Sequence, residues 1–157
     1  MSRIRLLISL LCLTSVIACS YGFVLDGATG GKKIALDQSV NQTHLQEAGM
    51  ILDTYIERTF SSMGLLRPKD PQYFLKCSIV SSWRERITSK SLQRTDRYRL
   101  NIRVLAKLTD AGGKAVWQSS FTDNGTFSEG GRDEDGLDEA CRKISQQIAR
   151  AVATLKP

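Results

Sequence analysis

The chain has 157 residues, of which 22 are Lys or Arg and 16 are Asp or Glu, so its formal net charge is +6. This length suits one domain with a real core, and 41% hydrophobic with 24% charged residues excludes both a disordered chain and a polytopic membrane protein. His44 is the single histidine, which excludes a metal site built from several histidines and leaves few options for Ser-His or Cys-His catalysis.

Residues 1–18 predict an export signal. Arg3 and Arg5 precede a largely apolar segment over residues 6–18. As a helix this segment would span roughly 20 Å, short of the ~30 Å hydrocarbon core of a bilayer, which favours a signal over an anchor helix.

The end of this segment, Val16-Ile17-Ala18-Cys19, resembles the bacterial lipobox. The resemblance implies cleavage before Cys19, a diacylglyceryl group on its thiol and a fatty acyl group on the new amine, which together give stable anchoring. An ordinary secretory signal that ends near a free cysteine is the alternative. Ser20 stands where an Asp often means inner-membrane retention, so transport to the outer membrane is permitted.

After cleavage we expect a lipidated, glycine-rich tether over residues 19–31 and a single domain over residues 32–157. Cys77 and Cys141 would then be an even pair in an oxidising compartment. They could form a disulfide between a strand and the last helix, or they could be two small buried apolar residues. The sequence leaves both interpretations open.

Two helices are predicted. Thr43 and Gln46 fit a capping box, and apolar residues then recur at helical spacing as far as Met63, with Gly64 as the stop. The last helix begins in an acidic segment over residues 133–135 and becomes basic later, as suits the helix dipole. A glycine-rich loop over residues 124–136 is expected to precede it.

Four strands are predicted, the first over residues 33–36 and the others after Pro71, where the apolar period becomes two. A tight turn over residues 110–113 joins the last two strands. The expected inward-facing residues are Tyr73, Leu75, Cys77, Ile79 and Trp83, then Tyr98, Leu100, Ile102, Val104, Ala106 and Leu108, then Ala115, Trp117, Ser119 and Phe121. The element order predicts an α+β two-layer sandwich, with two helices packed on one face of a four-stranded mixed sheet.

The alternation places basic residues on the face of the sheet opposite the helices. The expected members of this cationic face are Lys76, Arg84, Arg86, Arg97, Arg99, Arg103 and Lys107. Such a face could attract an anionic partner, or it could be a solvated surface that discourages edge aggregation. Nucleic acid is excluded as the partner, because the face lacks stacking aromatics and the export signal removes the chain from the cytoplasm.

Lipid phosphates are the abundant anions of a bacterial envelope, and arginine forks pair well with phosphate oxygens. Lys90 and Arg94 lie at the tip of a predicted hairpin, and Arg132 lies in the loop before the last helix. We expect these three residues to contact lipid head groups, with ordinary solvated loop charges as the alternative.

The mature sequence resembles the LptE family of outer-membrane lipopolysaccharide-assembly lipoproteins. The order and spacing of several segments carry this resemblance, and the terminal helix completes it. The segments are Cys19-Ser20-Tyr21-Gly22-Phe23, Ile34-Ala35-Leu36, Asn41-Gln42-Thr43, Ser81-Ser82-Trp83-Arg84-Glu85-Arg86, Arg97-Tyr98-Arg99-Leu100 and Gly113-Lys114-Ala115-Val116-Trp117.

This resemblance implies a protein that plugs the LptD β-barrel, supports assembly of that barrel and helps to deliver lipopolysaccharide to the outer leaflet. The Cys19 lipid would hold it on the periplasmic side of the outer membrane, in the inner leaflet. The basic face and loops would pack on the barrel lumen or bind lipopolysaccharide phosphates, with Lys90, Arg94 and Arg132 nearest the family's lipid-contact regions. No cofactor is implied.

Two other classes compete with this interpretation. A periplasm-facing accessory lipoprotein, such as a cell-wall synthase activator or a secretion component, could use the same fold. An enzyme is disfavoured, because the acidic run over residues 133–135 is explained by the helix dipole and Ser81-Ser82 has no partner base.

Overall fold

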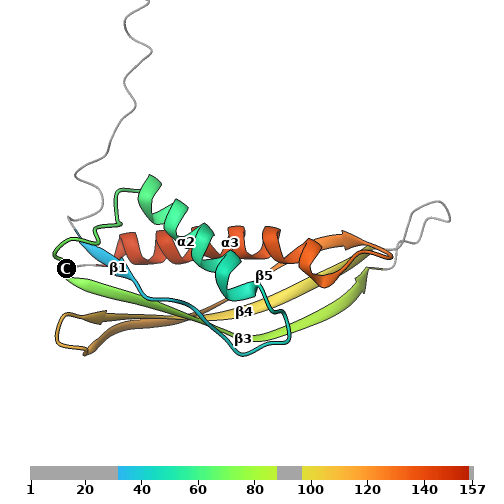
Figure 1. The fold of residues 1–157 in the computed structure, drawn as a ribbon, viewed down its shortest axis with the longest axis horizontal. Coiled ribbons are helices and arrows are strands. Elements are labelled where there is room, and N and C mark those ends of the chain that lie inside the picture. Colours follow the sequence, from blue (N-terminus) through green and yellow to red (C-terminus); the bar gives the residue numbers. More distant parts are fainter. Residues whose placement is uncertain (1–31, 88–96, 156–157) are drawn as a thin grey trace, which may run out of the picture.

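The computed structural model describes residues 32–87 and 97–155. Its elements follow one another in the chain as β1 (Ile34–Leu36), β2 (Val40–Asn41), α2 (Ala48–Ser62), β3 (Tyr73–Ile87), β4 (Arg97–Asp110), β5 (Ala115–Ser128) and α3 (Asp133–Thr154). Both helices lie on one side of the sheet (Figure 1), where α3 packs on β4 and β5, and α2 packs on α3. The predicted two-layer α+β sandwich is confirmed.

The sheet has the strand order β1-β3-β4-β5, and β2 pairs with the same long strand, β3, as β1 does. β1 and β2 run parallel to β3, whereas β3, β4 and β5 form an antiparallel meander. The sheet is mixed, as predicted, but it has five strands rather than four, because the two residues of β2 add a short pairing that alternation cannot reveal.

The core lies between the sheet and the helices. β4 supplies its central row, with Leu100, Ile102, Val104, Ala106 and Leu108 all at most 1% exposed. The largest fully buried side chains outside β4 are Ile34, Leu45, Leu52, Phe60, Leu65, Leu75, Ile79, Leu137 and Ile144. The alternation of β4 and the apolar stripes of the two helices therefore face each other, as the patterns predict.

The first helix begins later than predicted. The Thr43 hydroxyl donates to Asn41 Oδ1 at 2.8 Å, and the Thr43 backbone N–H donates to the same oxygen at 2.9 Å. Thr43 therefore belongs to a local turn and does not cap a helix, and α2 begins at Ala48 without any side-chain cap on Glu47.

The loop predicted over residues 124–136 is also partly wrong, because β5 continues to Ser128. Gly125, which suggested a loop, lies within the strand beside α3. A Cβ at this position would overlap the carbonyl oxygen of Gly136. The glycine therefore serves the close approach of helix and strand.

Candidate functional site

A β-bulge in β3 decides which side chains reach the open face of the sheet. Ile79 pairs with Val104, but the register shifts before Ser81, which pairs with Arg103. Because the extra residue reverses the alternation, the odd-numbered residues of β3 face the helices before the bulge and the even-numbered ones face them after it.

Two members of the predicted cationic face therefore lie on the helix side. Arg84 pairs with Leu100 and Arg86 pairs with Tyr98, and both partners belong to the inward-facing row of β4. The prediction that Arg84 and Arg86 face outward with the other basic residues was wrong, since it assumed strict alternation along the whole strand.

Arg84 instead holds the start of α3. Its Nε lies 3.3 Å from Asp133 Oδ1, and its guanidinium lies 5.4 Å from the ring centroid of Tyr98 and 5.9 Å from that of Phe127. His44 approaches the same carboxylate, with Nε2 3.6 Å from Asp133 Oδ2. The acidic first turn of α3 thus has a structural role here.

The register places the remaining basic residues on the open face. Arg97, Arg99, Arg103 and Lys107 are odd-numbered residues of β4, as are Asn101, Leu105 and Thr109, and Lys76 lies opposite Lys107 on β3. On the neighbouring strand β5 the same face carries an uncharged polar row, which consists of Gln118, Ser120, Thr122, Asn124, Thr126 and Ser128. We call the basic residues of β4 and β3 and the polar row of β5 together the open polar face.

The bulge also brings Trp83 and Glu85 onto the open polar face. Arg103 lies over the Trp83 ring, 5.9 Å from its centroid, and Trp83 Nε1 donates to Glu85 Oε1 at 3.0 Å. Arg99 Nη1 lies 3.8 Å from Glu85 Oε2. Trp83 was predicted to point inward, and the adjacent polar pair Ser81-Ser82, which breaks the apolar alternation, was the signal against it.

Two donors on this face have no hydrogen-bond partner among the residues that the structure describes. They are Arg99 Nε and Asn101 Nδ2, and Asn101 is only 7% exposed. Buried donors normally have a hydrogen-bond partner. These two groups can therefore donate hydrogen bonds to a carbonyl, carboxylate or phosphate oxygen of a bound molecule.

Arg132 is exposed and immediately precedes α3. Its backbone N–H donates to Asp135 Oδ2 at 2.8 Å, which fixes the first turn of the helix. The other predicted contact residues, Lys90 and Arg94, lie outside the described residues, as does the lipid attachment site Cys19.

Cys77 and Cys141 are free thiols and both are buried. Burial raises the pKa of each thiol to about 12, with smaller contributions from Asp53 near Cys77 and Asp138 near Cys141. Of the two interpretations left open by the sequence, the structure has the small buried residues and not the disulfide.

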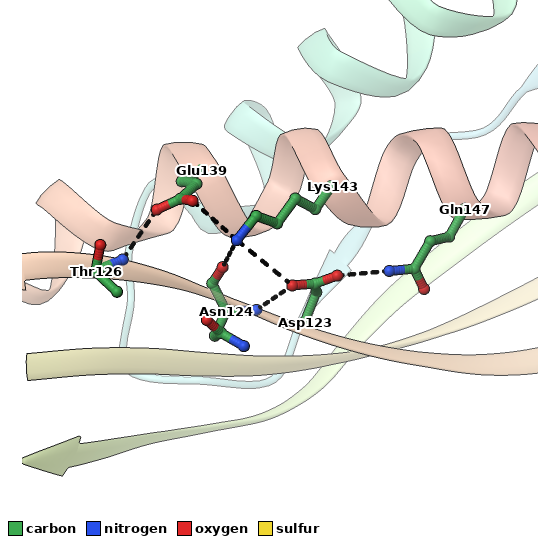
Figure 2. Close-up of polar contacts among 6 residues, drawn as sticks. All are labelled: Asp123, Asn124, Thr126, Glu139, Lys143 and Gln147. Carbon is green, nitrogen blue, oxygen red and sulfur yellow. Dashed lines mark hydrogen bonds and ion pairs between the residues drawn. The ribbon is translucent and has the colours of Figure 1, made fainter. Parts of the chain in front are cut away.

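The outer edge of β5 is partly covered by side chains of α3 (Figure 2). Lys143 Nζ donates to the carbonyl oxygen of Asn124 at 2.9 Å, and the Thr126 N–H donates to Glu139 Oε2 at 3.0 Å. Glu139 and Lys143 pair with each other at 2.8 Å, and Lys143 also lies 3.8 Å from Asp123. These contacts satisfy backbone groups that no neighbouring strand takes.

Within residues 32–87 and 97–155, no cluster of three or more His, Cys, Asp or Glu side chains could hold a metal ion. None of the helices in the same ranges has the length and apolar character needed to cross a membrane.

A family model described as lipopolysaccharide-assembly, LptE, matches residues 31–152. A minor lipoprotein from Acinetobacter baumannii has a similar structure, with a TM-score of 0.54 at 15% identity over 78% of this chain and 92% of that one. A putative lipoprotein from Caulobacter crescentus gives a TM-score of 0.52 at 17% identity over 76% of this chain and 88% of that one.

The hypothetical protein CT253 from Chlamydia trachomatis gives a TM-score of 0.54 at 10% identity over 78% of this chain and 95% of that one. At these identities the solved structures show a shared fold. Among curated proteins, none matches the chain. The family match covers most of the chain and both layers of the sandwich, and the chain belongs to the LptE family of lipopolysaccharide-assembly proteins.

Proposed function

We propose that this protein is the lipid-anchored plug of an LptD-type outer-membrane β-barrel, and that the pair delivers lipopolysaccharide to the outer leaflet. Family membership sets the general role in lipopolysaccharide assembly. The open polar face is the observation that supports the more specific role.

The interior wall of an outer-membrane barrel is polar, so a plug must present charges and hydrogen-bonding groups to it. The open polar face does so along most of β4 and β5, with Arg97, Arg99, Arg103 and Lys107 beside a row of hydroxyl and amide side chains that runs from Gln118 to Ser128. The unpartnered donors of Arg99 and Asn101 add buried hydrogen-bonding capacity to this surface. The helix layer leaves the face uncovered within the described residues.

The test is affinity purification of the tagged full-length protein from detergent-solubilised outer membrane, followed by mass spectrometry. One large β-barrel should be recovered in equal amount. A variant with Arg97→Glu and Arg103→Glu should lose the barrel, and a matched variant with Lys33→Glu and Lys69→Glu, both exposed elsewhere, should keep it. If the tagged protein is recovered alone or with a cell-wall enzyme, the result would contradict the barrel-plug function and favour an accessory lipoprotein.

The anchor in this proposal is the lipid on Cys19, which places the protein on the periplasmic side of the outer membrane. A Cys19→Ser variant should leave the outer-membrane fraction. Mass spectrometry of the unmodified protein should find acyl groups on Cys19 as the first residue. An unacylated mature chain would show that the segment is an ordinary secretory signal.

We also propose that Lys90, Arg94 and Arg132 contact lipopolysaccharide phosphates. Arg132 is exposed at the start of α3, where a charge can reach a ligand without rearrangement of the fold. Charge reversal at all three residues should weaken lipopolysaccharide binding by the full-length protein in detergent. Reversal of the exposed Lys33, Lys69 and Lys114 is the control, and equal effects in both variants would remove these residues from the proposal.

A further inference from the structure

A basic groove lies between the two helices, away from the open polar face. It has a volume of about 490 Å³ and is lined by side chains of α2 and α3. Arg58 comes from α2, whereas Arg142 and Arg150 come from α3, and all three arginines are exposed. None of them belongs to the cationic face that the sequence predicts.

Within the described residues, no carboxylate makes an ion pair with Arg58, Arg142 or Arg150, in contrast to Arg84 and Lys143. Two acids lie one turn before Arg142 on α3: Asp138 accepts a hydrogen bond from the Tyr55 hydroxyl at 2.6 Å, and Glu139 pairs with Lys143. The groove thus keeps a positive charge, which attracts anions.

Arg58 and Arg142 both line the groove together with Tyr55. Arg58 lies 5.7 Å from the centroid of the Tyr55 ring. Asp138 raises the pKa of Tyr55, whereas the charges of Arg58 and Arg142, one from each helix, both lower it. An anionic group beside Tyr55 would therefore meet two guanidinium groups, whereas the Tyr55 hydroxyl donates its proton to the Asp138 carboxylate and keeps its oxygen as an acceptor.

Arg150 provides a second basic position further along the groove. Arg142, Gln146 and Arg150 follow one another at four-residue spacing, so they share one face of α3. Eight residues of helix separate the two arginines by roughly 12 Å. This separation is larger than one phosphate, and Gln146 lies between the two positions with an amide that can bond a hydroxyl group.

The spacing between the helices is fixed at the groove. Thr59 of α2 and Ser145 of α3 share a hydrogen bond of 3.1 Å, and the Ser145 hydroxyl also donates to the Arg142 carbonyl at 2.8 Å. Because the two helices are joined here, the backbone positions from which the arginines extend are set before any ligand arrives. Preorganisation of this kind lowers the entropic cost of binding.

We propose that this groove is a binding site for a sugar that carries two phosphoryl groups, either free or as the head group of a lipid. Arg58 and Arg142 bind one phosphoryl group, Arg150 binds the other, and Gln146 and the Tyr55 hydroxyl bond the sugar between them. Planar guanidinium groups suit phosphate oxygens because they donate two parallel hydrogen bonds. The site lies on the helix layer and not on the open polar face, so its test is independent of the test of the barrel-plug function.

The experiment titrates the full-length protein in a nonionic detergent with fructose 1,6-bisphosphate and follows binding by calorimetry. Arg142→Gln combined with Arg150→Gln should weaken binding at least about tenfold, because each lost guanidinium removes charge-assisted hydrogen bonds. The control variant, Lys69→Gln with Lys114→Gln, loses the same charge at exposed sites and should bind like the wild type. Fructose 6-phosphate, with one phosphoryl group, should bind more weakly than the bisphosphate.

Further measurements distinguish a lipid-borne ligand from a free sugar phosphate, and both from nonspecific binding to anionic lipid. If fructose 1,6-bisphosphate displaces lipopolysaccharide from the wild type, the groove serves a lipid-borne head group. If it binds without displacing lipopolysaccharide, the ligand is a soluble sugar phosphate. The proposal is overturned if the bisphosphate does not bind, if the groove variant binds it like the wild type, or if only phosphatidylglycerol vesicles bind.

Discussion

Lys32 Nζ donates a hydrogen bond to the carbonyl oxygen of Val152 at 3.3 Å, joining the first described residue of the domain to the last turn of α3. The same ammonium also donates to the carbonyl oxygens of Ala153, at 3.4 Å, and Leu155. It donates to carbonyl groups at the end of α3, of which the Val152 carbonyl also accepts from the Leu155 N–H, and it sits at the negative end of the helix dipole. Burial lowers the pKa of Lys32, and the side chain has only 5% exposure.

We therefore predict that Lys32→Met lowers the free energy of unfolding by about 1–3 kcal/mol, because it keeps the aliphatic chain but removes the hydrogen bonds to carbonyl groups at the end of α3. Urea denaturation followed by circular dichroism measures this difference. Lys33→Met is the matched control, since Lys33 is exposed, and it should change stability by less than about 0.5 kcal/mol. Equal stability of the two variants would show that Lys32 does not hold the helix end.

Gly125→Ala should be strongly destabilising, by about 3 kcal/mol or more. The new Cβ would overlap the Gly136 carbonyl oxygen and would lie 3.0 Å from the Glu139 Cβ, so α3 would have to move away from β5. Thermal denaturation of the variant tests this. Gly49→Ala in α2 is the control, because its Cβ would meet only ordinary contacts at 3.5 Å or more, and alanine favours a helix.

The buried thiols predict slow chemical modification of the native protein. At pH 8 both Cys77 and Cys141 are protonated and inaccessible, so iodoacetamide should label them only after denaturation in urea. Peptide mass spectrometry of native and unfolded samples measures the labelling. Rapid labelling of the native protein, or a Cys77–Cys141 linked peptide, would contradict the structure.

The same thiols make stability depend on alkaline pH. Their pKa values are about 12 in the folded chain against an ordinary value of 9.0, so between these values the native state holds more protons than the unfolded state. The free energy of unfolding should therefore be undiminished below pH 9 and should fall as the pH rises from 9 towards 12. Denaturation across this range should show a shallower decline in a Cys77→Ala, Cys141→Ala variant.

Arg84→Met should lower the free energy of unfolding by about 1 kcal/mol, because it removes the pairing with Asp133 and the contacts over Tyr98 and Phe127. Arg97→Met, on the open polar face, is the matched control and should change stability by less than about 0.5 kcal/mol. The reverse order of effects in urea denaturation would mean that the bulge does not turn Arg84 towards the helices.

The accuracy of the sequence-based predictions depended on whether an element is defined by its own pattern. β4 is apolar at every even-numbered position from Tyr98 to Leu108, and α3 has both an apolar stripe and an acidic first turn, so both elements were predicted correctly. The bulge in β3 was missed because Ile79-Val80-Ser81-Ser82 contains no glycine or proline that would mark it. Its position is defined by pairing with β4, which is information from another part of the chain.

The basic groove could not be predicted for a similar reason. Arg142 and Arg150 lie on the polar face of an amphipathic helix, where such residues are usually solvated. They become a candidate site only because α2 packs beside them and brings Arg58 and Tyr55. The pattern of a single helix does not contain this tertiary relationship. The basic residues of β4, in contrast, lie in one strand, so its alternation alone predicted that they share a face.

The contacts of Glu139 and Lys143 with β5 predict a change in oligomeric state when they are removed. The Asn124 carbonyl and the Thr126 N–H belong to the outer edge of the sheet, where no further strand pairs in the described part of the chain. An open edge of this kind is a template for pairing with a second copy, and charged side chains normally prevent it. The hydrogen bond from Lys143, followed by that from the Thr126 backbone, lowers the pKa of Glu139.

We predict that Glu139→Ala with Lys143→Ala exposes these groups and makes the protein dimerise through β5, as measured by light scattering during gel filtration. Glu129→Ala with Lys114→Ala removes the same charges at exposed positions and should stay at the wild-type mass. Because the folded pKa of Glu139 lies below its ordinary value of 4.5, its contribution to stability is full above pH 4.5 and is lost as the pH falls through the lowered value. Acidification of the wild type should therefore reproduce the association of the variant, whereas an unchanged mass in both cases would show that the rest of α3 alone protects the edge.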